Sequence, residues 1–273
     1  PDGKHCLKVL EALGLNAAGT KASTVTGTKT KVEEEELRDR KLDEEAARKY
    51  RSVAATLNYL AQDRPDLGFA FKELCRSMSS PSELDQMKMK KLGRYLIGVG
   101  NTSIEAPWFC SLSRVDGFSD SDFAGSKDRT STSGGVIVFG SMVIRSWSKQ
   151  QKVIALSSGE AELYAAVKLG TELMGIKSLI QDFGFNVELT MHLDAKATIG
   201  MLSRRGAGNM KHVETNNFWL QSTIASKIIV LKKVSTERNV ADILTKFLTG
   251  DTISHLMKLM YIERMKTSTQ HRQ

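Results

Sequence analysis

Long apolar runs are absent from this sequence, and cysteine is scarce in it. No run approaches the ~20 apolar residues of a membrane span, and the basic, polar start has no signal-peptide core. The three cysteines, Cys6, Cys75 and Cys110, lack the spacing of metal ligands and do not suggest a secreted disulfide framework. We therefore expect buried or incidental thiols, an intracellular protein of the cytoplasm or nucleus, and no membrane partner.

What the sequence does contain is the composition of a folded protein with a basic surface. Its 273 residues, 41% hydrophobic and 26% charged, suffice for one large or two ordinary domains with their own cores. The formal net charge is +8 and the pI is about 9.3. A basic surface attracts a phosphate backbone through counterion release, but the same charge also serves plain solubility. Charge alone leaves both interpretations open.

The first hundred residues carry helical patterns. Pro65 stands where it would open one helix, and Ser80-Pro81-Ser82-Glu83 is typical of a capped start of the next, with an N-cap serine and a capping-box glutamate. The acidic run 33–36 is too short for an interaction tail and indicates a solvated face or loop. We predict an N-terminal helix and linker over 1–42 and a small helical region over 43–100.

The pattern changes after residue 101. Three short strands are followed by a long helix, a strand, a short helix, a mixed stretch, a last strand and a helix. The segments cover 115–118, 135–139, 142–147, 159–183, 188–193, 195–202, 217–225, 228–234 and 240–248. This order predicts an α/β domain over 113–248, with a mixed sheet covered by helices. A tail over 249–273 begins with a helix around 253–260.

Aspartates stand at the ends of several of these elements. Asp120 and Asp122 share one face of the first strand, so the alternation does not choose between them, and both also suit a turn. Asp194 ends an apolar strand, where open α/β sheets place ligands, but it equally suits an N-cap. Asp242 is typical of a first-turn aspartate favoured by the helix dipole.

Two glutamates at the start of the long helix differ in the roles open to them. Ser157-Ser158-Gly159-Glu160 fits a capping box in which Glu160 accepts a hydrogen bond from the Ser157 amide. That leaves Glu162 free to face a site, although a solvated helix glutamate is the commoner situation. Structural explanations fit each acid singly, but they do not predict the joint order Asp, Glu, Asp, Asp. Four converging carboxylates are what two divalent cations need to hydrolyse a phosphodiester.

Several motifs surround these acids and extend upstream of them. They are Phe118–Gly125, Arg129–Gly135, Ser146–Lys152, Ala155–Tyr164, Lys211–Glu214 and Ala241–Lys246, with Lys49–Ser52, Leu57–Leu60 and Arg64–Leu67 upstream. The first set, from about Arg114 to Leu248, resembles the ribonuclease H domain of copia-type retrotransposon polyproteins. The upstream set resembles the stretch that follows the polymerase palm in the same polyproteins. The family's polymerase motif Tyr-x-Asp-Asp is absent.

The resemblance implies both a fold and an activity. The fold is α/β, a ribonuclease H-like mixed five-stranded sheet with flanking helices, preceded by a small helical remnant of a reverse transcriptase thumb or connection. The activity is endonucleolytic cleavage of the RNA strand of RNA–DNA hybrids. The family's catalytic and metal-binding acids fall on Asp120, Glu162, Asp194 and Asp242, which would hold two Mg²⁺ ions, or Mn²⁺ in their place. The implied partners are an RNA–DNA hybrid and the polymerase region of the same polyprotein.

Seven further residues are candidates for substrate binding: Ser121, Trp147, Lys149, Lys152, Lys196, His212 and Arg238. Trp147 beside Lys149 and Lys152 suits a surface along a duplex, but it equally suits strand core with lysines on exposed alternate positions. For His212, a phosphate contact and a packed polar residue are both open.

The sequence departs from the family pattern in two places. Leu193-Asp194-Ala195-Lys196 replaces the family's Cys-Asp-Asn, which changes the local substrate contacts that we expect. The loop 235–239 has no histidine, whereas some cellular ribonucleases H place one there to help product leave, so Glu237 or Arg238 would have to substitute. Two rival interpretations are a catalytically silent nucleic-acid-binding fragment of a decayed retroelement and an integrase or transposase. Integrases and transposases use three acids, the last of them a glutamate on a helix, whereas the last acid in this sequence is Asp242.

Overall fold

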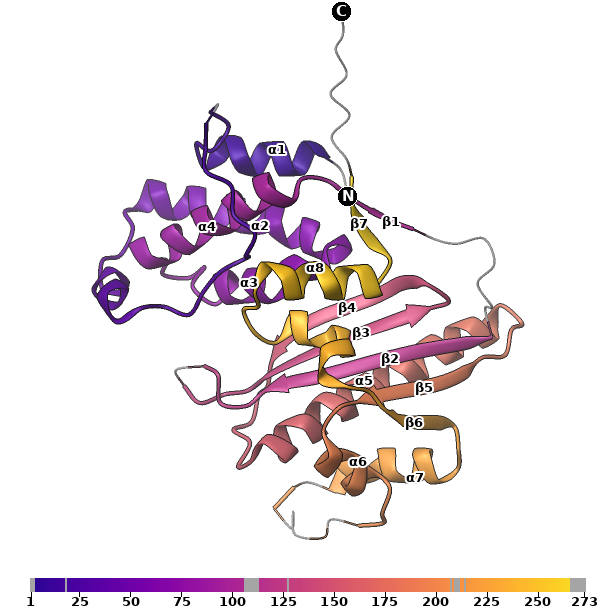
Figure 1. Ribbon diagram of the computed structural model, residues 1–273. Coiled ribbons are helices and arrows are strands. Elements are labelled where there is room, and N and C mark those ends of the chain that lie inside the picture. Colours follow the sequence, from indigo (N-terminus) through magenta and orange to yellow (C-terminus); the bar gives the residue numbers. More distant parts are fainter. Residues whose placement is uncertain are drawn as a thin grey trace, which may run out of the picture. The chain divides into compact units, whose positions relative to one another are not determined.

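A computed structural model describes residues 3–17, 19–105, 113–126, 128–206, 208, 212–213 and 215–265, without the side chains of Glu33, Thr215 and Asn216. It divides into two compact units (Figure 1). Unit 1 comprises Pro1–Glu105, Phe247–Lys258 and Ile262–Gln273, and unit 2 comprises Ala106–Lys246 and Leu259–Tyr261. The predicted domain boundaries stay predictions. Cys110, Lys211, Glu214 and the polar end 266–273 lie outside the described residues.

Unit 1 is mostly helical. Its elements are α1 (Gly3–Ala12), η1 (Val32–Arg38), α2 (Glu44–Asp63), α3 (Pro65–Cys75), α4 (Glu83–Val99), most of α8 (Gly250–Leu259), β1 (Thr102–Ile104) and β7 (Ile262–Arg264). The strands β1 and β7 form a two-stranded antiparallel sheet. Each is only three residues long, too short for a strand period to show in the sequence. The acidic run that we expected as a solvated face or loop is part of the 3₁₀ helix η1.

The start of α4 lies two residues later than predicted. Ser82, not Ser80, is the N-cap, and the capping box is completed by Asp85 rather than Glu83. The cause is a short pairing with the chain before α2: Leu42 N–H donates to the Pro81 carbonyl, and Glu83 N–H donates to the Arg40 carbonyl. Ser82 lies between these two bonds and pairs with Lys41 in an extended conformation, so the helix begins only after it.

Unit 1 also buries an ion pair completely. The Arg64 guanidinium, fully buried, donates from Nε and Nη2 to the two oxygens of Asp66, over 2.8 Å and 2.7 Å. The hydroxyl of Tyr95 donates to the same carboxylate over 2.8 Å, and Arg64 Nη1 donates to the Gly100 carbonyl over 3.2 Å. The Arg64 guanidinium therefore neutralises the charge of the buried Asp66 carboxylate.

Unit 2 is built on a mixed five-stranded sheet in the order β4-β3-β2-β5-β6. The strands are β2 (Arg114–Asp122), β3 (Thr132–Phe139), β4 (Met142–Gln150), β5 (Glu188–Leu193) and β6 (Ile229–Lys233). The pairs β2–β3 and β3–β4 are antiparallel, and β2–β5 and β5–β6 are parallel. The flanking helices are α5 (Ser158–Asp182), α6 (Lys196–Leu202) and α7 (Trp219–Ala225). The predicted mixed sheet with flanking helices is confirmed.

The long helix α5 packs across the central strand and makes the core of unit 2 (Figure 1). Leu163, Leu169 and Leu173 of α5 are fully buried in this core. Gly117 of β2 permits the close approach, because a Cβ there would lie 2.8 Å from Leu169 Cδ1. The helix and β2 are thus held at a fixed separation, which positions the residues at the end of both.

The helix predicted over 240–248 was wrong in extent. In its place is one short 3₁₀ turn, η4 (Val240–Leu244), which follows another, η3 (Thr236–Arg238). Asp242 N–H donates to the Asn239 carbonyl, and Thr245 N–H donates to the Asp242 carbonyl, which are i to i+3 bonds. Among the described helices, none combines the length and apolar character that crossing a bilayer requires.

Candidate metal centre

Asp120 is the most deeply placed of the predicted acids. It lies on β2 near the end of the strand, with 5% of its surface exposed. The Thr245 hydroxyl donates to its Oδ2. Burial, with the neighbouring charges of Asp242 and Glu162, raises the pKa of Asp120 well above its ordinary value. An acid with like charges and little water around it favours either a proton or a cation.

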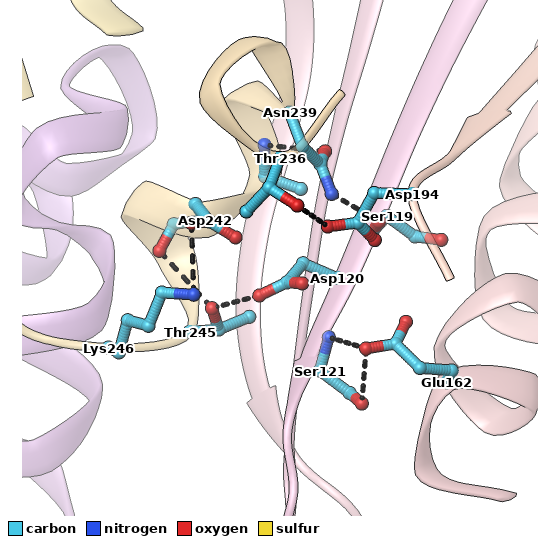
Figure 2. A network of polar contacts seen from close by, with 11 residues as sticks. Ser119, Asp120, Ser121, Glu162, Asp194, Thr236, Asn239, Asp242, Thr245 and Lys246 are labelled. Carbon is cyan, nitrogen blue, oxygen red and sulfur yellow. Dashed lines mark hydrogen bonds and ion pairs between the residues drawn. The ribbon is translucent and has the colours of Figure 1, made fainter. Parts of the chain in front are cut away.

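Glu162 projects from the second turn of α5 toward the same point (Figure 2). Its Oε1 accepts two hydrogen bonds from Ser121, one from the backbone N–H over 3.1 Å and one from the hydroxyl over 3.0 Å. Burial raises its pKa from 4.5 to about 7, with Asp194 and Asp242 adding to the rise and the Ser121 bonds opposing it. Ser121 therefore orients Glu162, and its predicted role in substrate binding stays a prediction.

Asp194 directly follows β5, where the sheet edge brings it beside Asp120 and Glu162. The Thr236 hydroxyl donates to its Oδ2 over 3.2 Å. One carboxylate oxygen from each of Asp120, Glu162 and Asp194 lies within 4.8 Å of the others. Hard cations such as Mg²⁺ prefer clustered carboxylate oxygens, so this trio is compatible with a divalent cation.

The fourth acid, Asp242, has a different environment. It lies in η4 with 6% of its surface exposed, and its Oδ2 is 2.9 Å from the ammonium Nζ of Lys246. Within the described part of the chain, nothing hydrogen-bonds to its buried Oδ1. Burial alone would lower the pKa of Lys246, but the charges of Asp120, Asp242 and Asp194 hold that pKa above its usual value. Lys246 is therefore charged at neutral pH.

Polar residues of the 3₁₀ turns hold this arrangement, and sequence reasoning missed them. Fully buried Asn239 donates from Nδ2 to the Ser119 carbonyl over 3.0 Å, and its Oδ1 accepts from Ala241 N–H over 3.3 Å. It thereby ties the Asp242 turn to β2 (Figure 2). Asn239, Thr245 and Lys246 all lie in or beside the motif Ala241–Lys246, which was the available signal.

The structure separates the pairs of acids that the sequence left open. A Cβ on Gly125 would lie 1.9 Å from Asp122 Oδ2, so the Asp122 carboxylate lies against the turn, and the cluster of acids found among the described residues contains Asp120 and not Asp122. Glu160 accepts from Leu156 N–H over 2.9 Å, not from Ser157, so the predicted capping box is only half formed. The remaining half, Ser157 Oγ accepting from Glu160 N–H, caps α5.

The remaining substrate candidates fall into two groups. Lys149, Lys152, Lys196 and Arg238 are exposed. Trp147 is partly buried against the core of unit 2, as its strand-core interpretation expects. His212 has its Nε2 3.0 Å from Glu160 Oε2. Because the His212 side chain is 46% exposed, a phosphate contact and a packed polar role both stay predictions. Binding roles for all seven candidates stay predictions.

Two curated proteins are similar to most of this chain. The retrovirus-related Pol polyprotein from transposon RE1 of Arabidopsis thaliana is 30% identical over 223 residues, covering 80% of this chain and 15% of that protein. The corresponding polyprotein from transposon TNT 1-94 of Nicotiana tabacum is 30% identical over 203 residues, covering 72% and 15%. This chain therefore spans about 15% of the length of these relatives.

No family model matches the chain. A solved structure of LC11-RNase H1, isolated from compost, is 18% identical and covers 49% of this chain and 93% of that one, with a TM-score of 0.36. Since that likeness is low, the fold assignment rests on the strand order and directions of unit 2.

Proposed function

This chain belongs to the Pol polyproteins of copia-type retrotransposons, and we propose that it cuts the RNA strand of RNA–DNA hybrids for such an element. The reaction is an endonucleolytic hydrolysis assisted by two divalent cations. Unit 2 would supply the catalytic residues, and the polymerase region of the same polyprotein would be its natural partner. The sequence contains no polymerase motif, so nucleotide addition is not proposed.

The observation that carries the proposal is the convergence of four acids from separate parts of the chain. Asp120 comes from a strand, Glu162 from a helix, Asp194 from a strand end and Asp242 from a 3₁₀ turn. Placing like charges together under burial costs free energy, so an arrangement of this kind needs a compensating partner. A scaffold that only bound nucleic acid would gain nothing from gathering negative charge.

The residues present fit divalent cations. All four are carboxylates, the hard oxygen ligands that Mg²⁺ and Mn²⁺ accept. The buried Oδ1 of Asp242 has no hydrogen-bond donor among the described residues, which leaves a lone pair for a ligand. Bound cations would supply Lewis-acid activation of water and charge stabilisation at the phosphate. Asp120, Glu162, Asp194 and Asp242 are the residues that we propose as ligands.

The chain's own contribution is to hold these carboxylates in position before substrate arrives. Ser121 fixes Glu162 with two hydrogen bonds, Thr245 holds Asp120, and Thr236 holds Asp194. Such preorganisation spares the site a rearrangement during the reaction. The net charge of +8 favours the approach of a polyanion despite the acidic centre.

We assign the substrate surface to exposed cations around the site. Lys149, Lys152, Lys196 and Arg238 are exposed and carry the charge that backbone phosphates require. Contacts to ribose 2′-hydroxyls distinguish an RNA strand from DNA in such complexes. Alanine variants of these four exposed residues should weaken hybrid binding while leaving cation binding unchanged.

The test is cleavage of a hybrid labelled on its RNA strand. The purified chain with Mg²⁺ should shorten that strand, and Asp194→Asn should abolish the cleavage. Asp182→Asn alters an exposed aspartate at the end of α5 and should cut like the wild type. Binding of the hybrid by the wild type without Mg²⁺-dependent cutting would instead support the silent fragment of a decayed element.

A further inference from the structure

The acid centre already contains one cation, which is part of the protein. Lys246 Nζ lies 2.9 Å from Asp242 Oδ2, and Figure 2 shows the lysine chain reaching in from the end of the η4 turn. The pair is of the i, i+4 type, but it differs from a surface pair because the Asp242 side chain is only 9% exposed. A pair with one buried partner is screened much less than an exposed one.

The four acids are therefore not equivalent. Asp120, Glu162 and Asp194 bring their oxygens within 4.8 Å of one another without a lysine or arginine in the ion pairs described for them. Asp242 stands outside that trio and is engaged by Lys246 through one oxygen, while its other oxygen has no donor in the described chain. One cation position is open, and the other is partly occupied by an ammonium group.

The lysine is able to leave. Its side chain is 39% exposed, and an ammonium on a flexible four-carbon stem reaches water by rotating. An ammonium group on Asp242 Oδ2 and a divalent cation on either oxygen of the same carboxylate lie close enough to repel each other. Binding of a divalent cation by Asp242 therefore competes with the lysine.

We infer that Lys246 is a built-in counter-ion of the second cation position: it holds Asp242 while that position is empty, and an entering divalent cation displaces it. The inference rests on the proposed metal centre and goes further, because it makes the two positions unequal. The trio would fill first, and the Asp242 position would fill at higher cation concentration. Lys246 is a positioning residue in this scheme and does not touch the reacting atoms.

Removing the charge should tighten the second position. Lys246→Met approximately keeps the length of the side chain but removes the ammonium group. A cation that binds Asp242 in this variant does not have to displace a charged group. Hydrogen bonds to charged groups are strong enough that about a tenfold fall in the dissociation constant of the second site is expected. In the absence of divalent cations the same variant leaves Asp242 uncompensated, so its melting temperature should fall and then recover when Mn²⁺ is added.

The experiment counts bound Mn²⁺ on the full chain by electron paramagnetic resonance at one neutral pH. The wild type should bind one ion tightly and a second more weakly, and Lys246→Met should tighten the second site more than the first. Lys246→Arg keeps the charge and should leave the second site weak. Lys168→Met is the matched control, since Lys168 forms an i, i+4 pair with Glu172 on α5 and should change neither site.

Three results would overturn the inference: two equivalent sites in the wild type, no second site in any variant, or a second site unchanged by Lys246→Met. If Lys246→Met does not fold without metal, the wild-type and Lys246→Arg isotherms still decide between unequal and equivalent sites. Ion counting requires no cleavage. A chain that binds Mn²⁺ as described but never cuts a hybrid would therefore refute the proposed function alone.

Discussion

Two buried aspartates, one in each unit, show opposite ways of keeping a carboxylate out of water. Asp66 and Asp120 are 2% and 5% exposed. Asp66 accepts hydrogen bonds from Nε and Nη2 of Arg64 and from the Tyr95 hydroxyl, so its charge is neutralised within the protein. Asp120 is buried beside two further acids, which raises its pKa, and the Thr245 hydroxyl and the charge of Lys246 oppose that rise only in part.

This difference is what we expect if Asp66 serves the fold and Asp120 serves the proposed metal centre. Burying a charge is tolerable when a partner of opposite charge is supplied with good geometry. Unit 1 supplies that partner from its own sequence. The acid centre of unit 2 has more negative charge than Lys246 offsets. This excess charge destabilises the fold unless a cation or a proton from solution compensates it.

The largest expected effect comes from breaking the internal pair of unit 1. Asp66→Asn leaves the fully buried Arg64 without its carboxylate, and removing one partner of a buried pair costs about 3–5 kcal/mol. Urea unfolding of the full chain should show this loss, with the exposed Asp182→Asn as control. A loss under about 1 kcal/mol, in the range of surface pairs, would contradict the comparison.

The same substitution in unit 2 should do the reverse to stability. Asp120→Asn removes a like charge from the acid centre, so the metal-free free energy of unfolding should stay the same or rise. Cleavage of a labelled hybrid should fall on the order of 100-fold or more, since one of the proposed cation ligands is lost. A destabilisation as large as that of Asp66→Asn would show that Asp120 has a structural role.

The pH dependence of stability should distinguish the two centres as well. The pKa of Glu162 is raised from 4.5 to about 7 in the folded chain, so the folded state binds more protons than the unfolded state between these values. The metal-free stability contributed by Glu162 is therefore present below pH 4.5 and is lost as the pH rises through 7. Thermal melts without metal should show this decline, and Glu162→Gln should flatten it. An unchanged slope in that variant would contradict the assignment.

The smallest effect should come from the residue that ties the Asp242 turn to the sheet. Asn239→Ala removes a turn cap and a buried hydrogen bond, which together cost about 1–2 kcal/mol. Because Asp242 loses its fixed position, Mn²⁺ binding should weaken at the second site more than at the first. Calorimetric titration measures both sites, and equal weakening of the two would show that Asn239 supports the fold alone.

Much of unit 2 could be predicted from the sequence. Strand and helix periods located the five strands and α5, because one face of each packs on a common core. The alternation could not choose between the acids, because Asp120 and Asp122 point to the same face of the strand. What distinguishes Asp122 is its contact with the turn at Gly125, which lies in the loop after the strand. The choice of Asp120 had to come from the family resemblance.

The supporting residues could not be predicted in the same way. Asn239 reaches Ser119 across 120 positions of the chain, and Thr245 reaches Asp120 across 125, so no local pattern contains these bonds. The Asp242 segment reads as a helix in hydropathy, yet Asn239 and Thr245 close it into a 3₁₀ turn. The start of α4 was displaced for the same reason, a pairing between segments some forty residues apart.

The most direct test of the metal centre is crystallographic. Crystals of the chain grown or soaked with Mn²⁺ should show an anomalous peak bound by oxygens of Asp120, Glu162 and Asp194, and at higher concentration a second peak at Asp242 with Lys246 displaced. No peak among these four acids at millimolar Mn²⁺, in crystals whose acid centre is open to solvent, would contradict the account.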